Sequence, residues 1–596
     1  MMTSMESEQL HKVRHSLAHL LAAAVLEEDK NAKLGVGPVI ENGFYYDILT
    51  SKPVSQTDLL KIEQKMRSLA KKNLAFVRSE LSVAQAKEMF ASQPFKIELI
   101  NDIETKGTTA MDESLKQAGK GIVSVYATGA FSDLCQGPHV ENTKDIARDA
   151  FRLTKIAGAY WRGSEKNPML TRIYGVAFAT KEELDAYLKQ QEEAAKRDHR
   201  KIGKELGLFT IIDEIGPGLP LFYPKGALLR TLVENYIGEL QKKSGYHPIW
   251  IPHVTKGELY RISGHLEKFD ALYPPMELKD EASYYLKPMN CPHFMMLYKS
   301  APHSYRELPL RWTSTTTNYR YEKSGELSGL TRVRALTQDD CHVFATPEQI
   351  EKEIALMLAM IQAAYRAFGF ADFWVRISTH DPAHPENYIG DKAVWKQSEA
   401  TLEKLIRSKK WKHEIGTGEA AFYGPKLDFM FRDAIGREWQ LSTIQLDMNL
   451  PERFALEYTD KDGVKKRPIV IHRAILGSTE RFLGILIEHF AGAFPLWLAP
   501  EQAWVMPIGK SHKKYAGEVL KLLSAHGIRA QLKDEDATIG KKIREGEQQK
   551  IPYMLIIGDK EVKSQSVAVR TKGADKGALK TKKLLAQLHM EIEKKK

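Results

Sequence analysis

One cysteine and two histidines form a candidate set of metal ligands. Cys291 lies in "LKPMNCPHF", His342 in "TQDDCHVF" and His472 in "IVIHRAI". A single cysteine before a proline, or a histidine in an apolar strand, is more often a packed core residue. Together, one thiolate and two imidazoles match a zinc site that keeps its fourth position open for a reactant. The long spacing alone does not establish that the three residues meet.

Arginines in two segments indicate an anionic substrate. Arg320, Arg332 and Arg334 lie on the strand-like arms of "NYRYEKSGELSGLTRVRALTQDD", on either side of a Gly/Ser turn. Arg481 falls in the first turn of an apolar helix that begins at "GSTERF", where a helix N-terminus already favours anions. Guanidinium suits phosphate because its planar fork donates paired hydrogen bonds. The alternative for each arginine is a surface ion pair. With an open zinc position, the set predicts a nucleotide and a second substrate.

A second group of ligand-type side chains lies near the N-terminus. "HSLAH" places His15 and His19 four residues apart, on one face of a helix. "FSDLCQGPHVEN" places Cys135 and His139 four residues apart, beside Asp133. The pattern is compatible with a metal site. The alternative is an amphipathic helix whose histidines are incidental.

The composition is that of an ordinary soluble enzyme. The 596 residues predict three or four domains, with 43% hydrophobic and 27% charged residues. Three scattered cysteines rule out a disulfide framework and favour a reducing, cytoplasmic location. No apolar run reaches the roughly 18 residues of a membrane span, so no membrane partner is expected. The run 17–26 is interrupted by His19 and followed by "EEDK", which predicts an amphipathic helix rather than a signal sequence.

Changes in composition divide the chain into four predicted parts. Residues 1–180 mix short helical and strand patterns, and residues 181–206 are highly charged and predict an exposed connecting helix. Residues 207–498 contain long strand-like runs. Residues 499–596 alternate strands and helices, which predicts a small α/β domain with a largely parallel sheet.

The positive charge is concentrated at the C-terminal end. The chain has a formal net charge of +11, and from Glu501 onward 21 lysines and arginines stand against 12 aspartates and glutamates. A solvated basic surface would account for this surplus. A surface that binds a polyanion, most simply nucleic acid, would account for it equally well.

Together, these segments resemble the threonyl-tRNA synthetase family of class II aminoacyl-tRNA synthetases, from about residue 11 to residue 590. "GYHPIWIPHV" resembles class motif 1, "YRYEKSGELSGLTRVRALTQDD" resembles motif 2 and "GSTERF" resembles motif 3. The resemblance implies an α+β multidomain protein. Its parts would be an α+β editing domain (1–180), a linker helix, a catalytic domain built on an antiparallel sheet (207–498) and a C-terminal α/β anticodon-binding domain (499–596).

The resemblance also implies a role for particular residues in the catalytic domain. Zn²⁺ would be held by Cys291, His342 and His472, and Mg²⁺ would arrive with ATP. The implied catalytic residues are Arg320, Arg481 and His265, the last linked to transfer onto tRNA. The implied ATP-binding residues are Arg320, Glu322, Arg332, Gln440, Thr443, Ser478 and Arg481. The implied threonine-binding residues are Gln338, Asp340, Tyr423, Lys426 and Gln445.

Roles are implied in the outer domains as well. The implied editing residues are His15, His19, Asp133, Cys135 and His139, acting by positioning and general acid–base chemistry without a metal. The implied anticodon contacts are Arg544, Glu561 and Arg570. Motif 1 implies a homodimer, and the small ubiquitin-like domain that commonly precedes the editing domain is expected to be absent.

The implied reaction attaches L-threonine to tRNA(Thr) through threonyl-adenylate, with AMP and diphosphate as products. A site that must bind the substrate hydroxyl can reject valine by about 10⁴ or more. Serine keeps the hydroxyl and lacks one methyl group, worth about 1–3 kcal/mol, so hydrolytic editing of seryl-tRNA is expected.

Three other functions are alternatives to threonine attachment. They are a tRNA-binding paralogue without synthetase activity, a stand-alone metal-dependent hydrolase built on the first domain, and a synthetase for serine or proline. Intact Arg320 and Arg481 and the zinc triad count against the first, the long class II core against the second, and the triad against the third.

Three positions depart from the family pattern. His293 directly follows Pro292, one position earlier than is usual, and is not an expected ligand. Leu441 replaces a residue that is often cysteine. Cys341 adjoins His342. Because adjacent residues on a strand point to opposite faces, Cys341 is expected to pack in the core.

Overall fold

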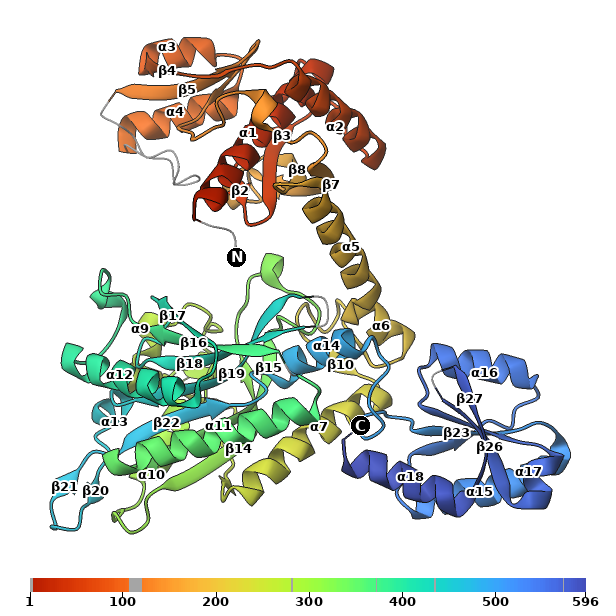
Figure 1. Cartoon of the computed structure of the whole chain (residues 1–596). Helices are drawn as coiled ribbons and strands as arrows, with labels where there is room; N and C mark the ends of the chain where they lie inside the picture. The colour runs from red at the N-terminus through yellow and green to blue at the C-terminus, as the bar shows by residue number, and fades with distance from the viewer. Residues whose placement is uncertain are drawn as a thin grey trace. The chain divides into compact units, whose positions relative to one another are not determined.

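The computed structural model (Figure 1) describes residues 4–106, 121–279, 282–370, 372–433, 436–571 and 573–595. Its internal contacts divide the chain into two compact units, residues 1–192 and 193–596. Each unit is described by itself below. Within the described ranges, every helix is too short or too polar to cross a membrane.

The first unit begins with a helix whose middle is fully buried. Helix α1 (Ser4–Glu28) packs in one core with α2 (Gln56–Lys71) and a five-stranded antiparallel sheet. The strands are β1 (Lys33–Leu34), β2 (Val39–Ile40), β3 (Gly43–Leu49), β7 (Phe151–Tyr160) and β8 (Met169–Ala177). Every residue of 15–25 is buried, so the prediction of a one-sided amphipathic helix was wrong. Neighbours cover this run on more than one side, and its polar residues His15, Ser16 and His19 are buried together with the apolar ones.

A smaller antiparallel sheet completes this unit. It joins β4 (Phe76–Ser82), β5 (Ile122–Thr128) and β6 (Phe131–Leu134), covered by α3 (Val83–Met89) and α4 (Pro94–Lys106). The end of β6 and the loop that follows it carry Asp133, Cys135 and His139. This brings that segment to the face of α1 that holds His15 and His19.

The connecting segment 181–206 forms two helices where one was predicted. They are α5 (Lys181–Arg197) and α6 (His199–Glu205). The carboxylate of Asp198 accepts a hydrogen bond from the backbone N–H of Arg200 at 2.8 Å, and so caps a new helix.

The second unit is built around an eight-stranded sheet in the order β11-β14-β15-β22-β19-β18-β16-β17. All pairings are antiparallel except the parallel pairs at the two edges. The strands are β11 (His247–Pro248), β14 (Leu310–Tyr319), β15 (Ala335–Ala345), β16 (Phe373–Thr379), β17 (His413–Thr417), β18 (Lys426–Arg432), β19 (Glu438–Asp447) and β22 (Ile469–Ala474). This is the antiparallel core that the sequence predicted.

Helices cover one face of this sheet and leave the other for the site. Helices α7 (Pro224–Lys243), α11 (Ile350–Ala367), α12 (Lys392–Lys409) and α14 (Thr479–Phe490) share the large core with side chains of that face. Helices α7 and α11 lie side by side (Figure 1). Cys341 is fully buried in this core, whereas its neighbour His342 belongs to the opposite face. The expected packing role of Cys341 agrees with this placement.

Short elements build the wall around the open face. They are β12 (Val254–Lys256), α8 (Gly257–Ser263), α9 (His265–Lys268), β13 (Tyr284–Leu286), α10 (Cys291–Lys299) and α13 (Leu450–Arg453). A separate apolar cluster beneath them includes Cys291, Phe294 and Tyr423. Two small hairpins, β9–β10 (Phe209–Thr210, Leu221–Phe222) and β20–β21 (Tyr458–Thr459, Lys465–Lys466), lie outside the main sheet.

The C-terminal part has its own core and a mixed sheet. Strands β23 (Ala503–Pro507), β24 (Ala530–Leu532) and β25 (Tyr553–Ile557) pair in parallel, but β26 (Ser566–Thr571) and β27 (Ala574–Lys580) add in antiparallel fashion. The prediction of a largely parallel sheet was therefore wrong for the last two strands, because no long crossover helix separates them. The helices are α15 (Lys513–Ala525), α16 (Ile539–Gln548), α17 (Asp559–Ser564) and α18 (Thr581–Glu593).

Candidate functional site

The fold brings Cys291, His342 and His472 together. Cys291 is the first residue of α10, and the two histidines are direct partners in the register of β15 and β22. All three side chains are buried, and one potential ligand atom from each lies within 4.8 Å of the others. These three residues were predicted from the sequence. Their spacing in the sequence did not show that they meet, whereas the pairing of β15 with β22 brings the two histidines together.

The hydrogen bonding of this cluster fits a metal ion. Both ring nitrogens of His342 and Nδ1 of His472 are buried and have no hydrogen-bond partner in the described part of the chain. Buried polar atoms are nearly always paired, so three unpaired nitrogens beside a thiol favour a metal-binding site here. The other nitrogen of His472, Nε2, lies 2.8 Å from Oδ2 of Asp447. A carboxylate behind a histidine is a common arrangement for orienting a zinc ligand.

The residues predicted to bind threonine extend from this cluster across the sheet. Opposite His472 in the register stands Gln445, and opposite Gln445 stands Lys426. The hydroxyl of Tyr423 donates to the amide oxygen of Gln445. Asp340 lies two residues from His342 on β15, and therefore on the same face. The predicted threonine-binding residues Asp340, Lys426 and Gln445 therefore lie on nearby strands of the sheet, close to the cluster.

A buried carboxylate that the sequence did not single out organises part of this group. Asp428, fully buried on β18, accepts from Gln440 at 2.7 Å and Thr443 at 3.2 Å. Its other oxygen lies 2.9 Å from Nζ of Lys426. Three predicted site residues therefore share one acceptor. No local motif marks Asp428, because its role depends on strand pairing.

Two further residues of this site, just before Cys291 in the sequence, were not predicted. The amide of Asn290 donates to Asp340 at 2.9 Å and accepts from Nζ of Lys287 at 3.0 Å. Lys287 is fully buried, and burial lowers its pKa to about 8. Burial raises the pKa of Asp340, and the hydrogen bond from Asn290 opposes that rise. Both residues lie in "LKPMNC", so the segment that contains Cys291 could have been searched for further site residues.

Two arginines of the predicted nucleotide site have no anionic partner. Arg320 contacts the carbonyl oxygen of Pro288 at 3.4 Å, and Nε of Arg481 donates to the carbonyl oxygen of Thr331 at 3.0 Å. Desolvation lowers the pKa of both guanidinium groups. Among the described residues neither arginine forms an ion pair, so these two desolvated cations would be stabilised by a bound anion.

The third arginine is engaged with neighbouring acids. Arg332 pairs with Glu322 at 2.8 Å and with Glu326 at 2.6 Å. Glu322, which was predicted to read adenine, lies against Arg332 in this structure. These pairs are partly exposed and therefore weak, so a phosphate can compete for the guanidinium. Ser478 caps α14 by accepting from the backbone N–H of Arg481 at 3.2 Å.

His265 lies near this group in a buried position. Its Nδ1 is 2.7 Å from the hydroxyl of Ser263, and its Nε2 faces the sulfur of Met289 at 3.1 Å. Burial, with the positive charges of Arg320 and His472, lowers its pKa to about 3. The imidazole is therefore neutral at pH 7.

The first unit holds a second buried cluster, formed by His15, His19, Cys135 and His139. Sγ of Cys135 lies 3.3 Å from Nε2 of His15 and 3.2 Å from Nε2 of His139. It also accepts from the backbone N–H of Gly137 at 3.2 Å. Burial lowers the pKa of His19 and His139, so both are neutral at pH 7. The structure brings all four residues together. Cys135 contacts His15 and His139 at hydrogen-bond length, whereas the buried Nδ1 of His19 has no hydrogen-bond partner among the described residues.

Two further residues join Asp133 beside this cluster. Nζ of Lys96 lies 2.5 Å from Asp133 and 3.0 Å from the hydroxyl of Tyr46, which itself donates to Asp133. Lys96 is only 2% exposed. Neither residue was predicted, because Lys96 lies on α4 and Tyr46 on β3, far from both histidine motifs in the sequence.

The three predicted anticodon residues differ in their surroundings. Arg544 is exposed on α16, and Arg570 pairs with Glu547 of the same helix at 3.0 Å. Glu561 accepts from the backbone N–H of Gly558 at 2.9 Å and so caps α17. The structure therefore connects Arg570 with the helix that carries Arg544, and gives Glu561 a structural contact.

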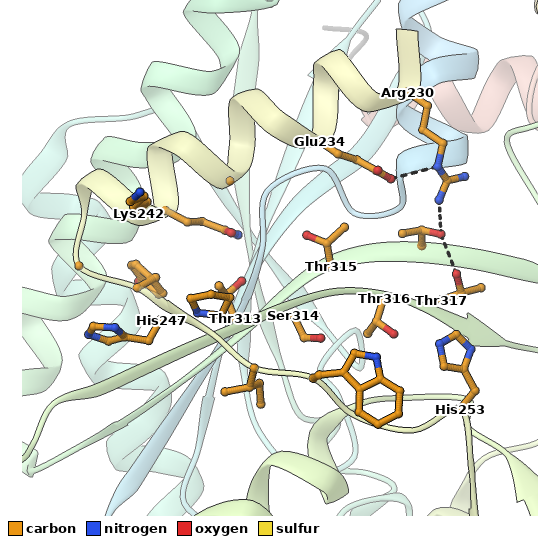
Figure 2. Close-up of a pocket in the computed structure, with 18 residues that line it drawn as sticks. Arg230, Glu234, Lys242, His247, His253, Thr313, Ser314, Thr315, Thr316 and Thr317 are labelled. Carbon is orange, nitrogen blue, oxygen red and sulfur yellow. Dashed lines mark hydrogen bonds and ion pairs between the residues drawn. The ribbon is translucent and has the colours of Figure 1, made fainter. Parts of the chain in front are cut away.

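A cavity of about 850 Å³ lies beside the motif 1 segment (Figure 2). Threonine and serine side chains of β14 line it, from Thr313 to Thr317. Arg230 bonds at its edge to Thr337 at 2.6 Å. Trp250 also lines it and is 80% exposed.

Three family models match the chain. The tRNA synthetase class II core domain (G, H, P, S and T) matches residues 275–490, the anticodon binding domain matches 502–590, and the threonyl and alanyl tRNA synthetase second additional domain matches 123–174.

Curated relatives and solved structures agree with these matches. The threonine–tRNA ligase of Rubrobacter xylanophilus is 49% identical over 96% of this chain and 87% of its own length. That of Borrelia hermsii is 45% identical over 98% of both. The crystal structure of the RNA-binding domain of threonyl-tRNA synthetase from Cryptosporidium parvum has a TM-score of 0.63 and 35% identity, covering 66% of this chain and 98% of that one.

Proposed function

Because the chain belongs to the threonine–tRNA ligase family, we propose that it joins L-threonine to tRNA(Thr) at the site around Cys291, His342 and His472. It is an ATP-dependent aminoacyl-tRNA synthetase with a class II core, an anticodon-binding domain and an editing-type domain. The observation that carries the assignment of the site is the buried thiol–imidazole cluster, in which three ring nitrogens lack a hydrogen-bond partner among the described residues.

In the first step, the two unpaired arginines would bind the triphosphate. Arg320 would contact the α-phosphate, and Arg481 with Arg332 would contact the β- and γ-phosphates alongside Mg²⁺. A carboxylate oxygen of threonine then attacks the α-phosphorus. The bond to the bridging oxygen breaks, and diphosphate leaves with its charge neutralised. Preorganised cations at the site of developing charge lower the barrier of such a transfer.

Selection of threonine would depend on the metal cluster. Cys291, His342 and His472 would hold Zn²⁺, which when bound would act as a Lewis acid toward the amino and hydroxyl groups of the substrate. Asp340, held by Asn290, would accept the proton of the substrate hydroxyl in a hydrogen bond. Gln338, Tyr423 and Gln445 would close the pocket.

In the second step, the 3′-terminal hydroxyl of tRNA attacks the carbonyl carbon of the adenylate, and AMP leaves. The neutral imidazole of His265 would position this hydroxyl. Its Nε2 faces only a thioether sulfur, a weak acceptor that a hydroxyl can displace. The buried group of the first unit would hydrolyse seryl-tRNA without a metal, with Lys96 and Asp133 beside the reacting ester.

The wider organisation is proposed on the same basis. We infer the four-part division at 180/181, 206/207 and 498/499, a cytoplasmic location and a homodimer that buries Trp250. Sedimentation equilibrium tests the dimer: twice the 67.6 kDa of one chain is expected. A single-chain mass at micromolar concentration would contradict it.

Charging of tRNA tests the proposed function as a whole. Purified protein, incubated with ATP, Mg²⁺, labelled threonine and tRNA(Thr), is expected to yield acid-precipitable threonyl-tRNA and an equal amount of AMP. Folded protein that charges no tRNA with threonine would overturn the proposal.

A further inference from the structure

His199 joins the connecting segment to both nucleotide-binding motifs. It is the first residue of α6, only 3% exposed, and lies outside every predicted site. Its Nδ1 is 2.6 Å from Oε1 of Glu488, near the end of the motif 3 helix α14. The backbone N–H of Leu330, in the motif 2 loop, donates to its Nε2 at 3.0 Å.

These contacts fix the form of the imidazole. A backbone N–H can only donate, so Nε2 of His199 accepts from Leu330, and Nδ1 carries the hydrogen that is donated to Glu488. Both ring nitrogens are thus occupied. Asp198, His199 and Glu488 are close enough together to resemble a metal site, but the occupied nitrogens leave the histidine no free electron pair to bind one.

The motif 2 turn is closely packed against His199 and against α14. A Cβ atom on Gly329, whose φ is +47°, would lie 2.2 Å from Nε2 of His199. A Cβ atom on Gly484 of α14 would lie 3.3 Å from side-chain atoms of Leu330 and Thr331. Two glycines therefore permit the close approach that the hydrogen bond to Leu330 requires.

The motif 2 turn carries Arg332 and contacts Arg481 of α14, the two cations of the proposed β,γ-phosphate site. Its backbone closes through the N–H of Ser328, which donates to the carbonyl oxygen of Arg332 at 3.1 Å. The carbonyl oxygen of Thr331 accepts from Nε of Arg481 at 3.0 Å. The backbone position of Arg332 and the side-chain orientation of Arg481 thus both depend on the turn that His199 holds.

We propose that His199 is a positioning residue for Mg·ATP. By accepting from Leu330 and donating to Glu488, it fixes the motif 2 turn against α14 so that Arg332 and Arg481 converge on the outer phosphates. Helix α6 would then support the ATP site. This inference rests on the proposed function and adds to it the residue that holds the phosphate-binding turn in place. His199 does not touch the threonine pocket residues, so its loss should spare threonine binding.

Three substitutions of His199 separate its two hydrogen bonds. His199→Ala removes both. In His199→Gln, the amide oxygen can reach the position of Nε2 and accept from Leu330. In His199→Asn, the shorter amide can replace only the donor to Glu488. If the bond to Leu330 positions the turn, glutamine should restore function and asparagine should not.

Two more variants serve as control and independent test. Lys201→Ala alters an exposed residue of the same helix and should behave as wild type. Gly329→Ala keeps His199, but the new methyl group would clash with the imidazole ring and displace the turn. It should therefore reproduce the effect of His199→Ala.

The measurement is calorimetric binding of Mg·ATP and of threonine to the full-length protein, which does not require the reaction to proceed. His199→Ala is expected to weaken Mg·ATP binding about tenfold, because a buried N–H loses its acceptor. Threonine binding should stay within twofold, and glutamine should restore most of the loss. Unchanged Mg·ATP binding in His199→Ala would overturn the inference. Equal loss of both ligands with a lowered Tm, unrepaired by glutamine, would also overturn it. Failure of tRNA charging with Mg·ATP binding intact would instead contradict the proposed function.

Discussion

Replacing Cys291 by alanine is expected to remove one zinc ion per chain and to lower threonine-dependent ATP–pyrophosphate exchange by about 10³-fold or more. A thiolate supplies one of only three protein ligands, and two histidines alone make a weak site. A Lewis acid at the substrate contributes several kcal/mol, and about 4 kcal/mol corresponds to a factor of 10³. Metal content by mass spectrometry and exchange on the same sample give the two readouts.

Cys341 offers a matched control for this experiment. It is also a buried cysteine, one residue from His342, but it faces the apolar core. Burial raises its pKa to about 11, so its thiol stays protonated. Cys341→Ala should keep its zinc and most of its exchange activity. Full zinc content in Cys291→Ala, or loss of zinc only in Cys341→Ala, would show that the ligands are wrongly assigned.

Replacing Lys96 by methionine is expected to slow deacylation of seryl-tRNA by about 10²-fold or more and to leave threonine charging within twofold. The ammonium group lies 2.5 Å from Asp133 in a buried site. Methionine keeps much of the length but cannot donate, so the carboxylate loses its counter-ion and the site loses a positioned acid. Hydrolysis of preformed seryl-tRNA measures the effect.

Lys106 provides the control, because it lies on the same helix α4 but is exposed and pairs with Asp102 at the surface. Lys106→Met should deacylate seryl-tRNA at the wild-type rate. Retained threonine charging in Lys96→Met would show that the catalytic unit is intact. Unimpaired deacylation in Lys96→Met would place hydrolysis away from this cluster.

Local patterns were enough to predict the elements that carry the site. The strand-like residues on either side of the Gly/Ser turn predicted the hairpin of β14 and β15, and the apolar helix beginning at "GSTERF" predicted α14. The zinc-type ligands were recognised from residue type and from the family resemblance. That His342 faces His472 follows from a strand pairing across 130 residues, which no local pattern encodes.

The residues that were missed take their roles from contacts that no local pattern encodes. Lys96 and Tyr46 each lie on an element remote in sequence from Asp133. Asp428 depends on the pairing of β18 with β19. The direction of β26 and β27 depends on the connection between them, and the alternation of strands and helices does not specify it. The break at Asp198 is a capping effect of a single side chain, and the overall charge of the segment conceals it.

Amino-acid-dependent ATP–pyrophosphate exchange on zinc-loaded protein, comparing threonine, serine and valine, tests the central claim most directly. Selection through the hydroxyl predicts clear exchange with threonine, weaker exchange with serine, and exchange with valine lower by about 10⁴ or more. Exchange with valine within tenfold of that with threonine would contradict selection by a metal held at Cys291, His342 and His472.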